Sequence, residues 1–363
     1  MKLNGIHALA AALVVVAAAA CGSDNNANAP AGNTGPVDCG GKNSLTAEGS
    51  TAQQNAIAEF AKTWGQLCPG KQLSYNPTGS GAGRNQFIAK QVDFAGSDSA
   101  LAGDQVAAAA QRCGGNPAWN LPVVFGPVAL AYHLSGVDKL VLNADVTARI
   151  FSGTITSWND PAIVALNPGV ALPNTKITPV WRSDSSGTTD NFQKYLAAAA
   201  PQAWTKGTGS EFQGGAGEGA QKSAGVVQAV QSSDGTVGYV EKGFASAAKL
   251  PFAWIDTGSG PVELTDESAG KAISAATFAG KGNDLALDLK SLYATKEPGA
   301  YPLVLATYEL VCSKGYDADT AGAVKSFLKV AANQGQANLS AAGYIPLPDA
   351  FKRRLLTSVD AIQ

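Results

Sequence analysis

Apolar positions in this chain alternate between strand-like runs and helical spacing. The run Ser44–Glu48 is followed by apolar side chains spaced as on one face of a helix: Ile57, Phe60, Ala61, Trp64 and Leu67. Leu73–Asn76 forms a second strand-like run, and a polar turn separates it from a helical segment at Asn85–Lys90. Because strands that alternate with helices pack as a sheet covered by crossover helices, the pattern predicts an α/β protein.

Two long apolar stretches, Leu121–His133 and Tyr301–Val311, lie far apart in the chain. A chain of 363 residues exceeds the size at which a single hydrophobic core stops growing, about 250–300 residues. Two such strands can carry the chain out of one lobe and back again. We therefore predict lobe I from residues 39–126 and 305–363, and lobe II from residues 127–304.

The C-terminal tail is predicted to add two amphipathic helices to lobe I, one carrying Phe327 and one carrying Leu355. In lobe II, Ile177–Trp181 is predicted to be a strand, and Asp190–Ala199 is predicted to be a helix.

The N-terminus has the pattern of a secretion signal. Lys2 precedes an apolar run, Ala8–Ala20, which has the length of a signal-peptide core and is too short to span a bilayer. The small residues before Cys21 resemble the cleavage site of a lipoprotein signal peptide, so we predict a signal over residues 1–20 and a lipid on Cys21. The alternative is ordinary cleavage after an Ala-x-Ala pattern, which would leave Cys21 as a free thiol. Residues 21–38 are mainly small and polar, and they predict a flexible tether.

The charge balance argues against nucleic acid as a partner. The chain has 26 Lys+Arg and 28 Asp+Glu, and removing a leader whose only charge is Lys2 leaves 25 basic against 28 acidic residues. A slightly acidic surface lacks the basic footprint that binds a phosphate backbone.

Four cysteines remain after Cys21, an even number that favours two disulfides in an exported protein. Three pairings are possible. Cys39 precedes the first strand and Cys68 ends the first helix, and a strand-turn-helix unit brings those ends together. We therefore predict Cys39–Cys68 and, by elimination, Cys113–Cys312. The absence of a CxxC pair argues against a zinc site.

The common catalytic motifs are missing. His133 is the only histidine outside the leader, and it lies in a predicted buried strand. No GxSxG, HExxH, Walker A or EF-hand pattern occurs. The sequence therefore predicts a protein that is not an enzyme and that carries neither a cofactor nor a metal.

Three segments share one design, in which a strand runs into a turn of Gly, Ser and Thr and then into a helix. They are Gly49–Thr51 before a helix at 52–67, Thr78–Gly83 before the helix near 85, and Arg182–Thr189 before the helix at 190. Backbone N–H groups, hydroxyls and the positive end of a helix dipole together form an anion site. Each segment alone is also explained as an ordinary helix cap, and Ser50-x-x-Gln53 could be a capping box.

Two charged residues narrow the choice of anion. Arg182 offers a planar fork of donors to an oxyanion, and Asp184 can orient that fork. Asp98 ends the next strand of lobe I, where a carboxylate would repel an anion unless the anion carries a proton to donate. Phosphate near neutral pH has such a proton, whereas sulfate has none, so the pattern favours phosphate.

Seven motifs resemble those of the phosphate-binding lipoprotein family (PstS) of the high-affinity Pst phosphate ABC transporter. The motifs occur in order over nearly the whole mature chain: Gly49–Ala52, Thr78–Gly83, Val92–Asp98, Trp158–Pro161, Arg182–Thr188, Gly238–Glu241 and Gly343–Pro348. The resemblance implies a type II periplasmic-binding-protein fold whose two lobes close over one phosphate in a cleft, with two crossover strands between them.

The resemblance also implies the residues of the site. These are Thr51, the Ala52 N–H, Ser80 and Asp98 from lobe I, and Arg182, Ser186, Gly187 and Thr188 from lobe II, with Asp184 supporting Arg182. Ala52 stands where many members have Phe, so the backbone donor is kept while the aromatic wall is lost or supplied elsewhere.

The implied protein is a monomeric extracytoplasmic receptor, held at the cell membrane by the lipid on Cys21, that delivers phosphate to the permease subunits of an ABC transporter. Two alternatives remain open. One is a secreted phosphatase or acyl-transfer enzyme that uses Ser80 or Ser186. The other is a receptor for sulfate, molybdate or another oxyanion. Asp98 is the residue that distinguishes this alternative from a phosphate receptor.

Overall fold

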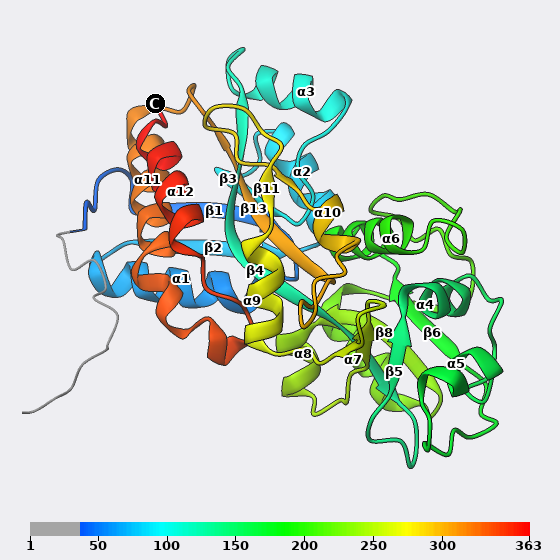
Figure 1. Ribbon diagram of the computed structural model, residues 1–363. Coiled ribbons are helices and arrows are strands. Elements are labelled where there is room, and N and C mark those ends of the chain that lie inside the picture. The colour runs from blue at the N-terminus through cyan, green and yellow to red at the C-terminus, as the bar shows by residue number, and fades with distance from the viewer. Residues whose placement is uncertain (1–36) are drawn as a thin grey trace, which may run out of the picture. The chain divides into compact units, whose positions relative to one another are not determined.

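The computed structural model describes residues 37–363, which are built on an eight-stranded mixed sheet with the order β2-β1-β3-β13-β4-β8-β6-β7 (Figure 1). The predicted signal sequence, Cys21 and the tether up to residue 36 lie outside the described residues.

The strands of the large sheet are β1 (Ser44–Gly49), β2 (Gln72–Pro77), β3 (Phe94–Ser97), β4 (Ala118–His133), β6 (Thr178–Arg182), β7 (Glu218–Ala220), β8 (Thr236–Glu241) and β13 (Val304–Cys312). Two small sheets contain β5 (Val141–Asn143), β9 (Trp254–Asp256) and β10 (Pro261–Val262), and β11 (Thr277–Phe278) with β12 (Leu287–Asp288). The helices are α1 (Gln54–Leu67), α2 (Ser80–Ile88), α3 (Asp104–Arg112), α4 (Ala144–Phe151), α5 (Pro161–Leu166), α6 (Gly187–Ala199), α7 (Lys222–Ser232), α8 (Lys242–Ala247), α9 (Asp266–Ser274), α10 (Lys290–Tyr293), α11 (Ala318–Ala332) and α12 (Asp349–Asp360), with short 3-10 turns at Gln334–Asn338 and Ser340–Ala342.

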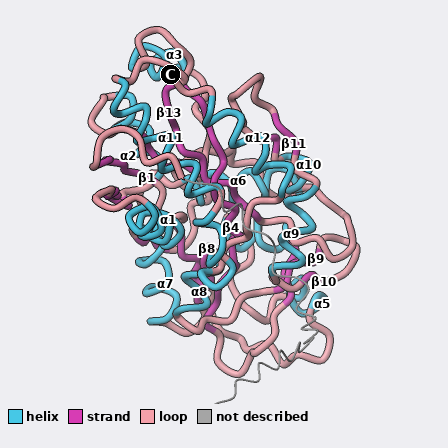
Figure 2. The backbone as a smooth tube through the Cα atoms, turned by 90° about the vertical axis from the view of Figure 1, so that its left-hand side faces the viewer, coloured by secondary structure: helices cyan, strands magenta, loops and turns pink. Residues whose placement is uncertain are grey.

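The long strand β4 joins the two parts of the large sheet. Its residues 118–127 pair antiparallel with β13, and its residues 128–133 pair antiparallel with β8. Figure 2 shows β13, β4 and β8 succeeding one another along the molecule. We call β2-β1-β3-β13 the first half of the sheet and β8-β6-β7 the second half. The predicted lobe boundaries fall near the change of partner on β4, and they stay a prediction.

Helices cover each half of the sheet through apolar faces. In the first half, Trp64 on α1 meets Phe327 on α11 edge to face, with ring centroids 5.5 Å apart, and its indole N–H donates to Ser326 Oγ at 2.8 Å. In the second half, Phe192 on α6 stacks on Tyr239 on β8 at 4.3 Å. Both predicted tail helices are confirmed as α11 and α12.

Two helices begin earlier than the sequence pattern predicts. α2 starts at Ser80 rather than near 85, and α6 starts at Gly187 rather than at 190. The apolar periodicity appears only after the first turn of each helix, because that turn is built from small residues that pack backbone against backbone. A Cβ on Gly83, for example, would lie 2.6 Å from the Cα atom of Gly49.

Strand β13 begins at Val304 rather than at Tyr301, since Pro302 has no N–H to donate to a neighbouring strand.

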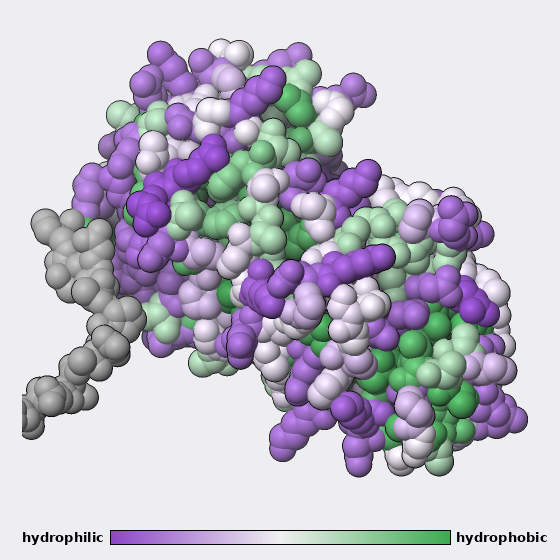
Figure 3. Space-filling view, in the orientation of Figure 1, coloured by the Kyte–Doolittle hydropathy of each residue, from purple (hydrophilic) through white to green (hydrophobic). Residues whose placement is uncertain are grey.

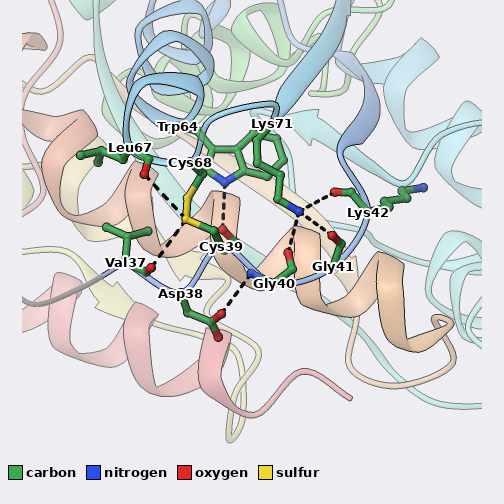
Figure 4. Close-up of a disulfide and its surroundings, with 11 residues drawn as sticks. Val37, Asp38, Cys39, Gly40, Gly41, Lys42, Trp64, Leu67, Cys68 and Lys71 are labelled. Carbon is green, nitrogen blue, oxygen red and sulfur yellow. Dashed lines mark hydrogen bonds between the residues drawn. A yellow bond between two sulfur atoms is a disulfide. The ribbon is translucent and has the colours of Figure 1, made fainter.

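Both predicted disulfides are confirmed, Cys39–Cys68 and Cys113–Cys312, with Cα atoms 5.5 Å and 5.3 Å apart. Figure 4 shows how the first disulfide ties the segment before β1 to the end of α1. Beside it, the Lys71 amine donates to the carbonyl oxygens of Gly40 at 3.0 Å and Lys42 at 2.9 Å. This segment is therefore fixed twice, by a covalent bond and by a buried ammonium group.

In the part of the chain from residue 37 onward, the large apolar side chains that are exposed lie on three different helices, at Leu67, Val106 and Val164. In the view of Figure 3, apolar side chains gather most over the part that holds β5 and α5. Among residues 37–363, no helix has both the length and the apolar character needed to cross a membrane.

Candidate functional site

Asp98 follows β3 directly and is 3% exposed. Its carboxylate accepts hydrogen bonds from three hydroxyl groups that lie in different parts of the chain. Ser50 Oγ, in the turn after β1, donates to Oδ1 at 2.6 Å, and Thr307 Oγ1 on β13 donates to the same oxygen at 2.7 Å. Ser80 Oγ, at the start of α2, donates to Oδ2 at 3.0 Å. Hydroxyl groups from the first half of the sheet, and from the segments that follow its strands, thus meet at one buried acidic group.

Burial is the main influence on this carboxyl and raises the pKa of Asp98 to about 6. The hydroxyls of Ser50, Thr307 and Ser80 lower the pKa, whereas the charge of Glu241 raises it. Near neutral pH most of the Asp98 population is therefore ionised. A buried carboxylate has more acceptor positions than these three hydroxyls fill, so it can accept a further hydrogen from a ligand.

The structure contradicts the alternative interpretation of Ser50 as the start of a capping box. The residue at the N-terminal boundary of α1 is Gln53, and its side chain makes no capping bond. Ser50 Oγ instead accepts from the Ala52 N–H at 3.0 Å while it donates to Asp98.

The N-terminus of α6 lies directly against this acidic group. A Cβ on Gly187 would be 2.5 Å from Ser80 Oγ and 2.6 Å from Asp98 Cβ. Ser186 caps the helix by accepting from the Thr189 N–H at 3.2 Å. Because this end of a helix is electropositive and has free N–H groups, a carboxylate or an anion is stabilised there.

Arg182 ends β6 and is 2% exposed, so its charge is almost fully removed from water. Its Nε donates to Asp184 Oδ1 at 2.7 Å, and Nη2 donates to the other oxygen. Burial alone would lower the pKa of Arg182, but the hydrogen bonds and charge of Asp184 outweigh burial and raise it. The same pair holds the pKa of Asp184 below its usual value despite partial burial. The predicted orienting role of Asp184 thus has the geometry of a two-pronged ion pair.

Glu241, at the end of β8, lies among the predicted residues although the sequence analysis assigned it no role. It is 1% exposed, and its Oε1 accepts from Thr188 Oγ1 at 2.6 Å. Its charge raises the pKa of both Asp98 and Arg182. The carboxylate therefore connects the Arg182 side of the cluster with the Asp98 side.

Arg84 on α2 is a second buried cation that the sequence analysis missed. Its Nη1 donates to Ser97 Oγ at 2.9 Å, and its Nη2 donates to Ser210 Oγ, in the loop after α6, at 2.8 Å. Burial is the main influence and lowers the pKa of Arg84, while the charges of Asp190 and Asp98 oppose that shift.

Polar contacts join residues that follow the first half of the sheet to α6, α7 and the turn before α6. Thr51 Oγ1 lies 2.9 Å from Ser223 Oγ on α7. The other contacts are Gly81 N to Ser185 O at 3.0 Å, Ser99 Oγ to Asp190 Oδ2 at 2.5 Å, and Asn191 Nδ2 to Asp98 O at 2.7 Å. All three predicted turns therefore face one junction.

A cavity of about 460 Å³ opens beside this junction and has Asp98 in its lining. Lys194 and Lys290 also line it, and Lys194 Nζ is paired with Asp190 Oδ2 at 2.6 Å. Asp288 lies in the same lining, so the charges around the cavity are mixed.

The sequence carried a signal for most of the missed residues. Ser50, Arg84 and Glu241 stand inside or directly after motifs that had been singled out, whereas Thr307 lies in an apolar strand without any turn signal. His133, at the end of β4, lies outside this cluster, and its buried Nδ1 has no partner among the described residues. Residues 37–363 contain no group of three or more His, Cys, Asp or Glu side chains placed to hold a metal.

Comparison with known proteins gives consistent matches over the whole length. Residues 23–334 match the family model of the PBP superfamily domain. The phosphate-binding protein PstS3 of Mycobacterium bovis is 50% identical over 372 aligned positions that cover 100% of both chains. PstS 3 of Mycobacterium leprae is 51% identical and also covers 100% of both chains. PstS 2 of Mycobacterium tuberculosis is 48% identical, covering 98% of this chain and 97% of the relative.

Solved structures share the fold at lower identity. A high-affinity periplasmic phosphate-binding protein (PfluDING) with bound phosphate has a TM-score of 0.71 at 24% identity, covering 86% of this chain and 93% of that chain. A phosphate-binding protein from Stenotrophomonas maltophilia has a TM-score of 0.67 at 20% identity, covering 87% and 94%. The predicted two-lobed α/β fold of the periplasmic-binding-protein class is confirmed.

Proposed function

Because the chain belongs to the PstS family of phosphate-binding proteins, we propose that it is an extracytoplasmic receptor that captures inorganic phosphate between its two lobes. The observation that carries the proposal is the position of Asp98. A buried carboxyl group lies directly against the electropositive end of α6, and Ser80 is next to both.

The binding set we propose is the one that the sequence analysis named. It consists of Thr51, the Ala52 N–H, Ser80, Asp98, Arg182, Ser186, Gly187 and Thr188. Arg182 supplies the one full positive charge of this set, with Asp184 holding its guanidinium, and neutral donors supply the rest. Such a site replaces the water around an anion with fixed dipoles, which costs little reorganisation when the anion enters.

Asp98 gives the site its preference between tetrahedral oxyanions. A phosphate that keeps one proton can donate it to the carboxylate. Sulfate has no proton to donate, so it would place two acceptors against each other in a buried site. A mismatch of this kind can discriminate by about 10⁴–10⁵-fold.

Capture involves movement of the lobes about β4 and β13. We propose lobe I as residues 39–126 and 305–363, and lobe II as residues 127–304. The contacts of Gly187, Asn191 and Ser223 across the junction support this assignment, because each would be made when the lobes approach.

The remaining parts of the proposal concern the membrane. The protein acts as a monomer, a lipid on Cys21 anchors it at the outer face of the cell membrane, and it delivers phosphate to the permease of an ABC transporter. The ATPase of that transporter would be supplied by other chains.

We propose a receptor rather than an enzyme, since neither candidate serine is paired with a histidine. Ser80 Oγ donates to Asp98, and Ser186 Oγ accepts a helix N–H. Hydrolysis of a chromogenic phosphate ester, abolished by Ser80→Ala, would instead favour a phosphatase.

Calorimetric titration of the purified protein, after removal of endogenous ligand, tests the proposal. We expect phosphate to bind tightly at one site and sulfate to give no measurable heat. Equal binding of the two anions would contradict it.

A further inference from the structure

Glu309 is a buried acid in β13 that the proposed binding set does not use. It is 0% exposed, and neither carboxyl oxygen has a hydrogen-bond partner among the described residues. Alternate residues of a strand point to the same face, so Glu309 lies on the face of Thr307, which donates to Asp98. An acid without a partner therefore stands beside the acid that we assign to phosphate.

The amide of Gln53 lies next to Glu309. The residue directly opposite Glu309 on β3 is Gly96, which has no side chain. A Cβ on Gly96 would be 2.0 Å from Gln53 Nε2 and 2.8 Å from the hydroxyl oxygen of Tyr75. Because side chains of directly paired residues lie about 4.5–5.5 Å apart, the groups that fill the place of the missing side chain are neighbours of Glu309.

Gln53 is the first member of a chain of polar groups that leads to Ser50. Its Nε2 donates to the Tyr75 hydroxyl at 3.2 Å, and that hydroxyl donates to the Ser50 carbonyl oxygen at 2.7 Å. Gln53 Oε1 is buried and has no donor in the described part of the chain. A neutral carboxylic acid at Glu309 would supply the missing donor, because only its protonated form carries an O–H.

The surroundings oppose a negative charge on Glu309. No ion pair between residues 37 and 363 includes it, so ionisation would leave a buried charge without compensation. The titratable groups around it are Asp98, after β3, and Tyr75, on β2, with Tyr344 beyond Tyr75. None of these is a cation.

The pKa values agree with this geometry. Burial raises the pKa of Glu309 to about 8, the nearby amide of Gln53 acts in the opposite direction, and the charge of Asp98 raises it. Burial also raises the pKa of Tyr75 well above its usual value. In the range above pH 7.5, Asp98 is already ionised and Tyr75 is still neutral, so Glu309 is the member of this group that changes charge.

We propose that Glu309 is a positioning residue for phosphate binding: as a neutral acid it donates an O–H hydrogen bond to Gln53 Oε1 and thereby holds the Ser50–Ala52 turn in place through Tyr75. The inference rests on the proposed function. When the proton leaves at alkaline pH, the turn loses a fixed point and a second negative charge appears behind Asp98. Phosphate binding should then weaken.

The test is calorimetric titration with inorganic phosphate at pH 7.5 and pH 9.5. We expect the wild-type protein to lose about tenfold in affinity, the size of effect produced by one added charge at intermediate dielectric. Glu309→Gln keeps a donor for Gln53 but cannot ionise, so it should bind phosphate as the wild type does at pH 7.5. Its loss of affinity between pH 7.5 and pH 9.5 should be at least about fivefold smaller than that of the wild type. Glu263 is exposed, so Glu263→Gln is the matched control and should follow the wild type.

The outcomes separate the two claims. A loss at pH 9.5 that Glu309→Gln shares in full would overturn the role of Glu309 alone, and failure of the wild type to bind phosphate at pH 7.5 would overturn the proposed function. Should Glu309→Gln not fold, carbon-13 NMR of the wild type labelled at glutamate carboxyl carbons decides the matter. A glutamate carboxyl that stays protonated at pH 6.5 supports the proposal, and complete ionisation of all glutamates at that pH overturns it.

Discussion

Gly187 lies so close to Asp98 that a Cβ on the glycine would be 2.6 Å from the Cβ of the aspartate. The two residues come from different parts of the large sheet, since Asp98 follows β3 and Gly187 begins the helix after β6. A helix N-terminus and a buried acid can approach in this way only where the first residue of the helix has no side chain. This contact is the point at which the proposed site is assembled.

Gly187→Ala should therefore hinder the approach of the two sides. The new methyl group must displace Ser80 Oγ or the backbone around Asp98, and we expect phosphate affinity to fall by at least about tenfold, in line with the ~1–3 kcal/mol cost of inserting a methyl group into a packed region. Calorimetric titration measures the effect.

Gly270→Ala is the matched control for that substitution. Gly270 also lies in a helix, α9, and a Cβ there meets nothing within 4 Å. Gly270→Ala should bind phosphate as the wild type does. An equal loss of phosphate affinity in both variants would contradict a specific role of Gly187 in the site.

Arg182→Ala should weaken phosphate binding by about 2–5 kcal/mol, the range measured when one partner of a buried charged pair is truncated. The loss includes the cost of leaving Asp184 without its guanidinium. Arg149→Ala provides the comparison, because Arg149 is more exposed and pairs with Asp145 only at 3.7 Å. An unchanged affinity in the Arg182 variant would remove this residue from the binding set.

Arg84→Met should lower phosphate affinity although Arg84 is outside the proposed binding set. The substitution removes the hydrogen bonds that the guanidinium donates to Ser97 and Ser210, and a hydrogen bond to a charged group contributes about 1.5–3 kcal/mol. Because the contact with Ser210 joins α2 to the loop after α6, we expect the affinity to fall about tenfold. Melting temperatures of the ligand-free variant and wild type show whether the loss is instead one of general stability.

Asp98 should make the unfolding free energy of the ligand-free protein depend on pH. Its folded pKa of about 6 exceeds the ordinary value of 3.8, so the folded state keeps a proton that the unfolded state has released. The stability contributed by this group is therefore complete at about pH 3 and decreases as the pH rises to about 7, by about 3 kcal/mol in total.

The Asp98→Asn variant isolates that dependence because it cannot ionise. Denaturant unfolding between pH 3 and pH 8 should show the free-energy difference, variant minus wild type, rising by about 3 kcal/mol up to about pH 7 and then remaining level. A difference that stays constant across this range would contradict the raised pKa.

Local sequence patterns were sufficient to predict the strands and the turns that carry Ser80, Asp98 and Arg182. Polar and glycine residues directly after apolar strands mark positions where side chains collect at one edge of a sheet. Predicting the starts of α2 and α6 required tertiary information, since Ser80 and Gly187 join their helices through backbone packing that leaves no apolar periodicity.

Thr307 and Glu309 could not be assigned from the sequence for a different reason. Both lie in an apolar strand, where a single polar residue gives no sign of its partner. Their roles depend on their neighbours across the sheet, which are Asp98 for Thr307 and the space over Gly96 for Glu309. The register of the sheet determines those neighbours.

The most direct test of the central claim is the preference between phosphate and sulfate in wild type and Asp98→Asn, measured by calorimetry at neutral pH. We predict that the wild type binds phosphate and rejects sulfate, and that the variant narrows this ratio by several orders of magnitude because its amide can donate to an unprotonated oxyanion. A ratio that is unchanged by the substitution would contradict the role of Asp98 as the acceptor of a proton from the ligand.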